Sequence, residues 1–143
     1  MEIKNLQNLK RINQSEISLI VERLLNLLSI EDKYISLVFC DNRFIKKLNY
    51  LYFGKDLPTD VISFNLQDKF NPNYLGEVIV SVEEALVNSK VYGTDWKEEI
   101  ILYIIHGLLH ILGYDDNSIK NKKIMEAKQR ELLHSLYNSK QLR

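Results

Sequence analysis

The chain has 143 residues, of which 45% are hydrophobic, and this size fits one folded domain spanning residues 1–143. Lysine plus arginine equals aspartate plus glutamate at 19 each, which excludes a global positive field, so any contact with nucleic acid must be local. A single cysteine, Cys40, excludes an internal disulfide and closes an apolar run, so we expect it to be a buried structural thiol. No apolar signal segment follows Met1, which favours a cytoplasmic protein.

The predicted order of elements begins with alternating strands and helices and ends with two strands followed by three helices. Runs rich in β-branched and aromatic residues predict strands over residues 1–5, 33–40, 60–66 and 75–82, which together make a small mixed sheet. Apolar residues at helical spacing and capping residues predict five helices, which begin near residues 15, 42, 82, 95 and 118. No repeat or linker interrupts this order.

Capping residues indicate where these helices begin and end. The expected N-caps are Ser15, then Asp41 or Asn42, Ser81 or Val82, and Thr94 with Asp95, and the expected stops include Gly54 and Gly93. In the last helix, the residues expected to face inward are Ile124, Ala127, Leu132, Leu133 and Leu136. His134 is expected on the surface, and residues 139–143 are expected to form a frayed basic tail.

The stretch from Ile100 to Asp116 is the most informative in the chain. Its first thirteen residues are apolar on nearly every face apart from His106 and His110, so a helix here is buried, yet it is too short to span a bilayer. Four residues turn a helix by about 400°, so the two imidazoles lie on one face and can bind one metal ion. A chain that turns back after Gly113 brings Asp116 beneath the same ion, giving a three-ligand site with an open position.

The spacing of these residues matches that of H-E-x-x-H-x-x-G-x-x-H metallopeptidases. However, Gly107 takes the place of the general-base glutamate and Asp116 that of the third histidine, which weakens the hypothesis of a metallopeptidase. A glycine inside a helix costs about 1 kcal/mol relative to alanine, so Gly107 indicates that substrate or another strand passes close to the backbone. The alternative without a metal is a pair of satisfied core histidines followed by an ordinary turn.

Three separated motifs resemble one known family. The run from His106 to Asp116 resembles the H-G-x-L-H-L-x-G-Y-D-H signature of the YbeY family, bacterial single-strand-specific endoribonucleases that mature ribosomal RNA. Leu48-Asn49 with residues 55–64 is similar to the family's L-N-x-x-Y-R-x-x-D-x-P-T-D-V-L-S-F segment, and residues 75–81 are similar to its L-G-D-I-x-I-S strand. The resemblance implies an α+β fold, with a small mixed sheet and packed helices around a central buried metal-binding helix.

The chain departs from the family pattern at two functional positions. Asp116 stands where the family has a histidine, and Phe53 stands where the family has an arginine thought to act on the phosphate. Lys55 is a weak candidate for supplying positive charge to the phosphate in place of the arginine, because a lysine ammonium is a point charge, whereas a guanidinium forms two parallel hydrogen bonds. The alternative is a solvated lysine. Phe53 either stacks on a base or packs in the core. Asp115 is the rival third ligand, although a role in capping or in orienting a histidine is favoured.

The resemblance implies a metallo-endoribonuclease that acts in 16S ribosomal RNA 3′-end maturation and ribosome quality control. Its implied partners are single-stranded RNA, ribosomal RNA and the small ribosomal subunit or its assembly components, with no membrane. Zinc held by His106, His110 and Asp116 is the implied cofactor, although the same ligands also suit iron(II). Metal-bound water is then expected to attack the phosphodiester, more weakly or at higher pH than with a third imidazole. The alternative is a non-catalytic ribosome-assembly factor with a structural metal.

Overall fold

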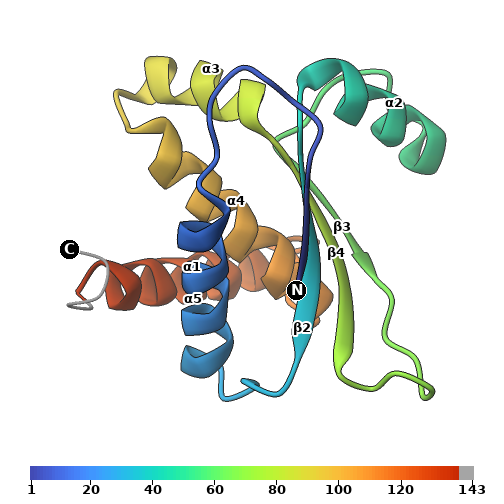
Figure 1. The fold of residues 1–143 in the computed structure, drawn as a ribbon, viewed down its shortest axis with the longest axis vertical. Coiled ribbons are helices and arrows are strands. Elements are labelled where there is room, and N and C mark those ends of the chain that lie inside the picture. The colour runs from blue at the N-terminus through green and yellow to red at the C-terminus, as the bar shows by residue number, and fades with distance from the viewer. Residues whose placement is uncertain (139–143) are drawn as a thin grey trace.

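The computed structural model describes residues 1–138, and four of its segments form one mixed sheet (Figure 1). The strands are β1 (Glu2–Asn5), β2 (Tyr34–Cys40), β3 (Val61–Asn65) and β4 (Tyr74–Ser81). Their order across the sheet is β1-β2-β4-β3, and β2 pairs in parallel with both β1 and β4. β3 runs antiparallel to β4 at the edge of the sheet. The predicted mixed sheet and the α+β class are therefore confirmed.

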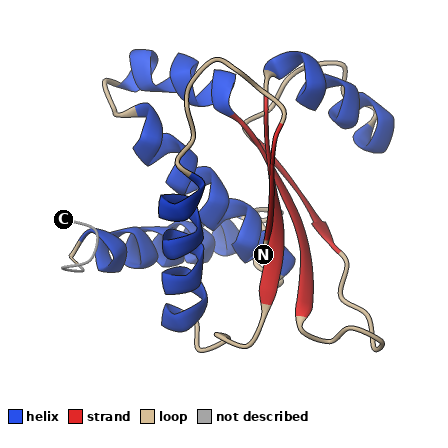
Figure 2. Cartoon of the chain, viewed as in Figure 1, coloured by secondary structure: helices blue, strands red, loops and turns tan. Residues whose placement is uncertain are grey.

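Helices cover the two faces of the sheet unequally. The helices are α1 (Gln14–Leu27), α2 (Asn42–Phe53), α3 (Val82–Tyr92), α4 (Trp96–Ile111) and α5 (Ile119–Tyr137). α1, α4 and α5 lie on one side of the sheet and α2 lies on the other, which is plain where the strands are seen edge-on (Figure 2). No helix within residues 1–138 is long and apolar enough to cross a membrane.

The alternation of side chains along the strands produces two apolar cores. In β2, Ile35, Leu37 and Phe39 face the larger core, which also contains the buried side of α4. Val38 and Cys40 point the other way into a smaller cluster with Ile45, Ile62 and Ile79, between the sheet and α2. Cys40 is fully buried, as predicted. α4 contacts α3, α5, β3 and β4, which makes it the central helix of the fold.

Most predicted caps are confirmed, but the first is wrong. Asp41, Ser81 and Asp95 each accept a hydrogen bond from a backbone N–H in the first turn of their helices. Ser118, where the last helix was expected to begin, does the same for α5. For α1 the cap is Asn13, whose Oδ1 accepts from the N–H of Glu16 at 3.1 Å, so Ser15 lies inside the first turn. Asparagine and serine are about equally good caps, and the sequence pattern does not fix the helix register by two residues.

The inward face of α5 differs from the prediction in two positions. Ile124 is 49% exposed and Ala127 is also exposed, whereas Leu132 and Leu136 are buried as expected. The buried stripe begins instead at Met125 and continues through a half-buried polar residue, Gln129. Because this inward-facing residue is polar, the apolar residues of α5 alone do not show which face of the helix is buried. His134 is exposed, as predicted. The expected tail over residues 139–143 lies outside the described residues.

Candidate metal centre

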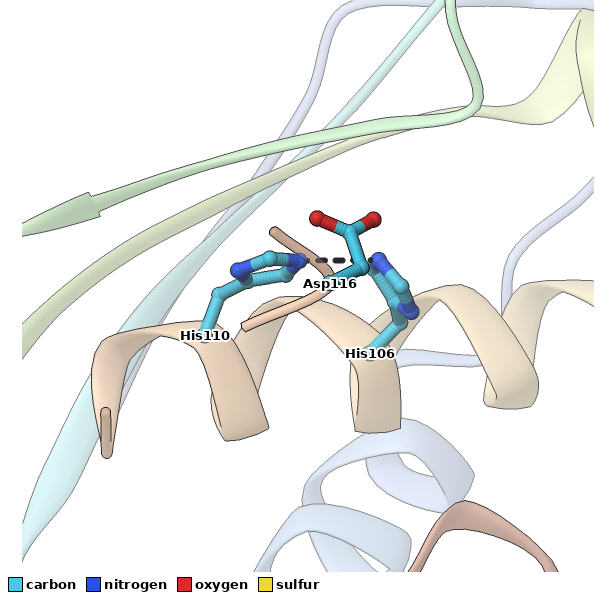
Figure 3. Close-up of side chains that lie close together, drawn as sticks. All are labelled: His106, His110 and Asp116. Carbon is cyan, nitrogen blue, oxygen red and sulfur yellow. Dashed lines mark hydrogen bonds between the residues drawn. The ribbon is translucent and has the colours of Figure 1, made fainter. Parts of the chain in front are cut away.

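The two histidines of α4 converge as their spacing predicts. His106 and His110 lie one turn apart, and their Nε2 atoms face each other at 3.0 Å (Figure 3). Their ring centroids are 4.6 Å apart, with an angle of 64° between the ring planes. Both rings are half-buried, so they are held by the packing of α4 while one side stays accessible.

The turn after α4 brings Asp116 to the same place. Gly113 has a φ of +102°, a conformation that side chains disfavour, and the N–H of Tyr114 donates to the carbonyl of Leu109 at 3.0 Å. This reversal returns the chain so that the Asp116 carboxylate lies beside the two imidazoles (Figure 3). One ligand atom from each of the three residues lies within 4.8 Å of the others.

This set of atoms fits a divalent ion. Nitrogens bound to one tetrahedral zinc at about 2.0–2.1 Å are separated by roughly 3.3 Å, close to the spacing of the two imidazole nitrogens. His106, His110 and Asp116 form the group of histidine, cysteine and acidic residues that could hold a metal within residues 1–138. Because Asp116 is exposed, the group is open on one side, as a site that admits a further ligand requires.

A groove of about 500 Å³ leads to the open side of this group. His110 and Asp116 line it together with polar residues from α2, β3 and the loop between them: Asn49, Lys55, Thr59, Ser63 and Asn65. Phe53, at the end of α2, also lines the groove. Both positions that depart from the family pattern, Phe53 and Asp116, therefore face the same space, and so does Lys55.

The loop before β3 is fixed by residues of the second motif. The buried Asn49 donates through Nδ2 to the carbonyl of Leu57 at 2.9 Å, which ties this loop to α2. Asp60 accepts from the N–H of Val61 at 2.8 Å and from the hydroxyl of Thr59 at 3.3 Å. These bonds fix the loop before β3, and the loop holds Lys55 and Thr59 along the groove.

The environment of His106 favours its neutral form. Burial lowers the pKa of His106, and the neighbouring His110 lowers it further, while Asp60 and Asp116 act in the opposite direction. A neutral imidazole has a free lone pair for a metal ion, whereas an imidazolium has none. The pKa shift therefore suits the role of a ligand.

Gln129 of α5 contacts the other ring nitrogen of His106. Its side-chain amide lies against Nδ1, so that Nε2 points toward His110 and Asp116. Ligating histidines commonly hydrogen-bond through the nitrogen that does not bind the ion. The sequence alone does not indicate this role for Gln129, because the residue lies on a different helix and belongs to none of the three motifs.

Asp115 does not orient either histidine. Its Oδ1 accepts from the N–H of Asn117 at 3.1 Å and from Nδ2 of Asn121 at 2.9 Å. The carboxylate thus stabilises the turn that leads into α5, which agrees with the capping role among the two that we expected. The suggestion that it orients a histidine receives no support from these contacts.

Gly107 allows α4 to pack closely on the sheet. A Cβ at this position would lie 2.7 Å from Cγ1 of Val78 in β4 and 3.1 Å from Cγ2 of Val61 in β3. The two explanations for a glycine here were a close substrate and a close strand. The neighbours of Gly107 are two strands, so the second explanation holds. The same packing sets the distance between the histidines of α4 and the groove beside β3.

Comparisons with known proteins agree with this fold. Residues 2–137 match the family described as Endoribonuclease YbeY. Proteins named Endoribonuclease YbeY from Carboxydothermus hydrogenoformans and Syntrophus aciditrophicus are 34% and 36% identical, over 94% of this chain and 96% and 88% of theirs. A solution structure of a Thermotoga maritima protein has a TM-score of 0.64 at 27% identity and covers 92% of this chain and 87% of its own.

The fold and the His106, His110 and Asp116 group thus define an α+β protein with a possible metal-binding site beside a groove. The relatives that share its sequence along nearly the whole chain are RNA-cleaving hydrolases by name. The chain belongs to the YbeY endoribonuclease family.

Proposed function

We propose that this chain is a metal-dependent endoribonuclease that cleaves single-stranded RNA, with His106, His110 and Asp116 as the ligands of one zinc ion. The convergence of these three side chains at the open end of a groove carries the proposal. Membership in a family of endoribonucleases supports the same activity. By family resemblance, the substrate is ribosomal RNA, with the 3′ end of 16S ribosomal RNA as the site of processing and ribosome quality control as the wider role. The small ribosomal subunit or its assembly components are the corresponding partners.

When bound, the ion acts as a Lewis acid toward a phosphoryl oxygen and makes water a stronger acid. The residues of the chain hold it and shape the approach of the substrate. His106 and His110 supply imidazole nitrogens from a rigid helix, and Asp116 supplies a carboxylate at the solvent side. Lys55 is the one cation among the described residues that line the groove, and we assign to it the attraction of a phosphate beside the ion.

The close packing of Gly107 argues against the metallopeptidase alternative. That activity needs a glutamate base at this position on the helix. Here the position faces the buried Val78 and the neighbouring Val61, so a side chain would enter the sheet and not the groove. No residue at this position can therefore act on a bound peptide.

The test is metal content and RNA cleavage measured on the same preparations. We would compare the native chain with His110→Ala and Asp116→Ala by elemental analysis, and assay each for cleavage of a single-stranded oligoribonucleotide. His134→Ala is the matched control, because His134 is an exposed histidine on α5 away from the groove. Asp115→Asn tests the rival carboxylate.

We expect near-equimolar zinc in the native chain and in His134→Ala, with zinc and cleavage both lost in His110→Ala and reduced in Asp116→Ala. Metal retained in Asp116→Ala but lost in Asp115→Asn would assign the third ligand to Asp115. Metal present in a native chain that cleaves no RNA would overturn the proposal in favour of an assembly factor with a structural ion.

A further inference from the structure

The outward side of α2 carries an unusual set of exposed residues. Lys46 and Lys47 follow Arg43 by three and four residues, Tyr50 follows these lysines by four and three, and Phe53 follows Tyr50 by three. These five side chains therefore lie on one face of the helix. All five are exposed, and the two rings are 62% and 54% exposed. We call this face the α2 stripe. The opposite side of α2, with Ile45 and Asn49, packs toward the sheet.

The α2 stripe concentrates positive charge in a chain that is neutral overall. Between residues 42 and 55 there are four basic residues and no carboxylate, although the whole chain has 19 of each charge. Lys46 has Asp56 at 3.9 Å, but both side chains are largely exposed, and such pairs are weak. Asp41 precedes the helix and is engaged as its N-cap. Glu83 and Glu84 accept hydrogen bonds from Asn42 at the first turn of α2. The positive charge therefore lies along the outward side of the helix beyond this turn, where it attracts polyanions.

The α2 stripe continues into the groove of the candidate metal centre. Phe53 is the last residue of α2 and lines the groove with His110 and Asp116, and Lys55 follows two residues later. The ring of Phe53 lies nearly parallel to that of Phe64, with 9° between the planes and 6.4 Å between centroids. The rings of Phe64 and Tyr52 pack edge to face, with 4.9 Å between their centroids and 63° between their planes. These contacts hold the Phe53 ring at the mouth of the groove while half of its surface stays exposed.

We propose that the α2 stripe binds single-stranded RNA and leads it to the groove, an inference that rests on the proposed endoribonuclease function. Arg43, Lys46 and Lys47 contact phosphates, while Tyr50 and Phe53 stack on bases. Cations interleaved with exposed rings are the combination that binds single strands without regard to sequence. A duplex keeps its bases stacked on one another and leaves the two rings without partners, so the single strand is the occupant that fits. The helix is about 18 Å long, which gives the strand an extended contact outside the groove.

The test is binding of a fluorescent single-stranded oligoribonucleotide to the full chain as purified. Anisotropy would be measured at low temperature over a range of salt concentrations, with the integrity of the RNA checked on a gel afterwards. The double substitution Lys46→Gln/Lys47→Gln removes two cations that neutralise phosphates, so it should reduce the slope of log affinity against log salt by about 1.4. The matched control is Lys90→Gln/Lys97→Gln, which removes two exposed lysines from α3 and α4, and its slope should stay close to native.

Stacking is tested separately from charge. Tyr50→Ala should weaken binding of the single strand by about 5-fold to 150-fold, whereas Tyr50→Trp should preserve it. The same oligoribonucleotide annealed to its complement should not distinguish these two variants. Because the substituted positions are exposed, thermal unfolding should be unchanged, and this measurement separates a defect in binding from a defect in folding.

The outcomes separate this inference from the proposed function. If the native chain cleaves RNA but Lys46→Gln/Lys47→Gln and Tyr50→Ala bind as tightly as native, with an unchanged salt slope, the α2 stripe is not the binding surface. Equal losses in the control variant would also overturn it, since binding would then follow net charge alone. If the native chain binds RNA through the α2 stripe without cleaving it, the inference stands and the proposed function fails.

Discussion

The side-chain amide of Gln129 on α5 contacts Nδ1 of His106 on α4, and this contact turns Nε2 of the same ring toward His110. A histidine that binds an ion through Nε2 carries its proton on Nδ1 and needs an acceptor there. The amide oxygen of Gln129 provides that acceptor once the amide is rotated by half a turn, which exchanges its oxygen and nitrogen and leaves the rest of the side chain in place. Gln129 thus acts as a positioning residue for a ligand that it supports from another helix.

The role of Gln129 predicts a loss of metal affinity without a loss of fold. Gln129→Leu removes the acceptor at similar size and should weaken zinc binding by roughly 10-fold to 100-fold, while Gln129→Glu should restore binding because a carboxylate accepts the same hydrogen bond. Competition with a chromophoric chelator measures the affinity, and the nitrogen chemical shifts of His106 report which ring atom carries the proton.

The neighbouring residue Arg130 provides the control for this prediction. Arg130 is exposed on the same helix, so Arg130→Leu should leave both the affinity and the histidine spectrum unchanged. Native affinity in Gln129→Leu would show that the packing of α4 alone holds the ring, and Gln129 would then be a structural residue.

The parts of the site that follow local rules could be predicted from the sequence. His106 and His110 converge because of helix geometry, and Asp116 joins them through a turn only a few residues long. The strands were visible as runs of β-branched residues, and the sheet that they form is mixed, as predicted. The helix, the turn and the individual strands each depend on residues close together in the chain.

The parts that depend on packing between distant elements could not be predicted. Gln129 lies 23 residues from His106, and only the crossing of α5 over α4 brings the two together. The exposure of Ile124 has the same origin, because the face of α5 that is buried depends on where the helix crosses its neighbours. The position of β3 at the edge beside β4 likewise appears only once the sheet has formed, and so does the identity of the strands that approach Gly107.

Gly107→Ala should destabilise the fold in spite of its better helix propensity. Alanine gains about 1 kcal/mol in a helix interior. The new Cβ would lie 2.7 Å from Val78, a stiff and fully buried side chain, and overpacking of this kind costs typically 1–3 kcal/mol. We therefore expect a net loss in the free energy of unfolding, measured by urea denaturation.

A double-mutant cycle identifies the cause of that loss. Val78→Ala makes room for the added methyl group, so Gly107→Ala should cost less in the Val78→Ala background than in the native chain. Additive effects of the two substitutions would show that the cost does not come from this contact.

Asn13 and Ser15 form a matched pair for testing where α1 begins. Asn13 caps the helix through a hydrogen bond from the N–H of Glu16, whereas Ser15 is an exposed residue of the first turn. Asn13→Ala should lower the free energy of unfolding by about 1 kcal/mol, and Ser15→Ala should change it by less than about 0.5 kcal/mol. Chemical denaturation of both variants checks this, and the reverse ranking would place the cap at Ser15.

The buried thiol of Cys40 predicts how stability changes at alkaline pH. Burial, with a smaller contribution from Asp41, raises the pKa of this thiol from 9.0 to about 12. Between these values the unfolded chain has lost the thiol proton and the folded chain has kept it, so the free energy of unfolding falls as pH rises. The slope from this one group is at most about 1.4 kcal/mol per pH unit. Cys40→Ala removes this contribution, so the decline in stability from pH 8 to pH 10, measured by urea unfolding, should be shallower in the variant than in the native chain.

Alkylation by iodoacetamide gives a second measurement, because the thiolate is the reactive form: the native chain should react slowly at pH 8.5 and rapidly once unfolded. Rapid alkylation of the folded chain, or equal declines in the two proteins, would contradict a thiol buried between α2 and the sheet.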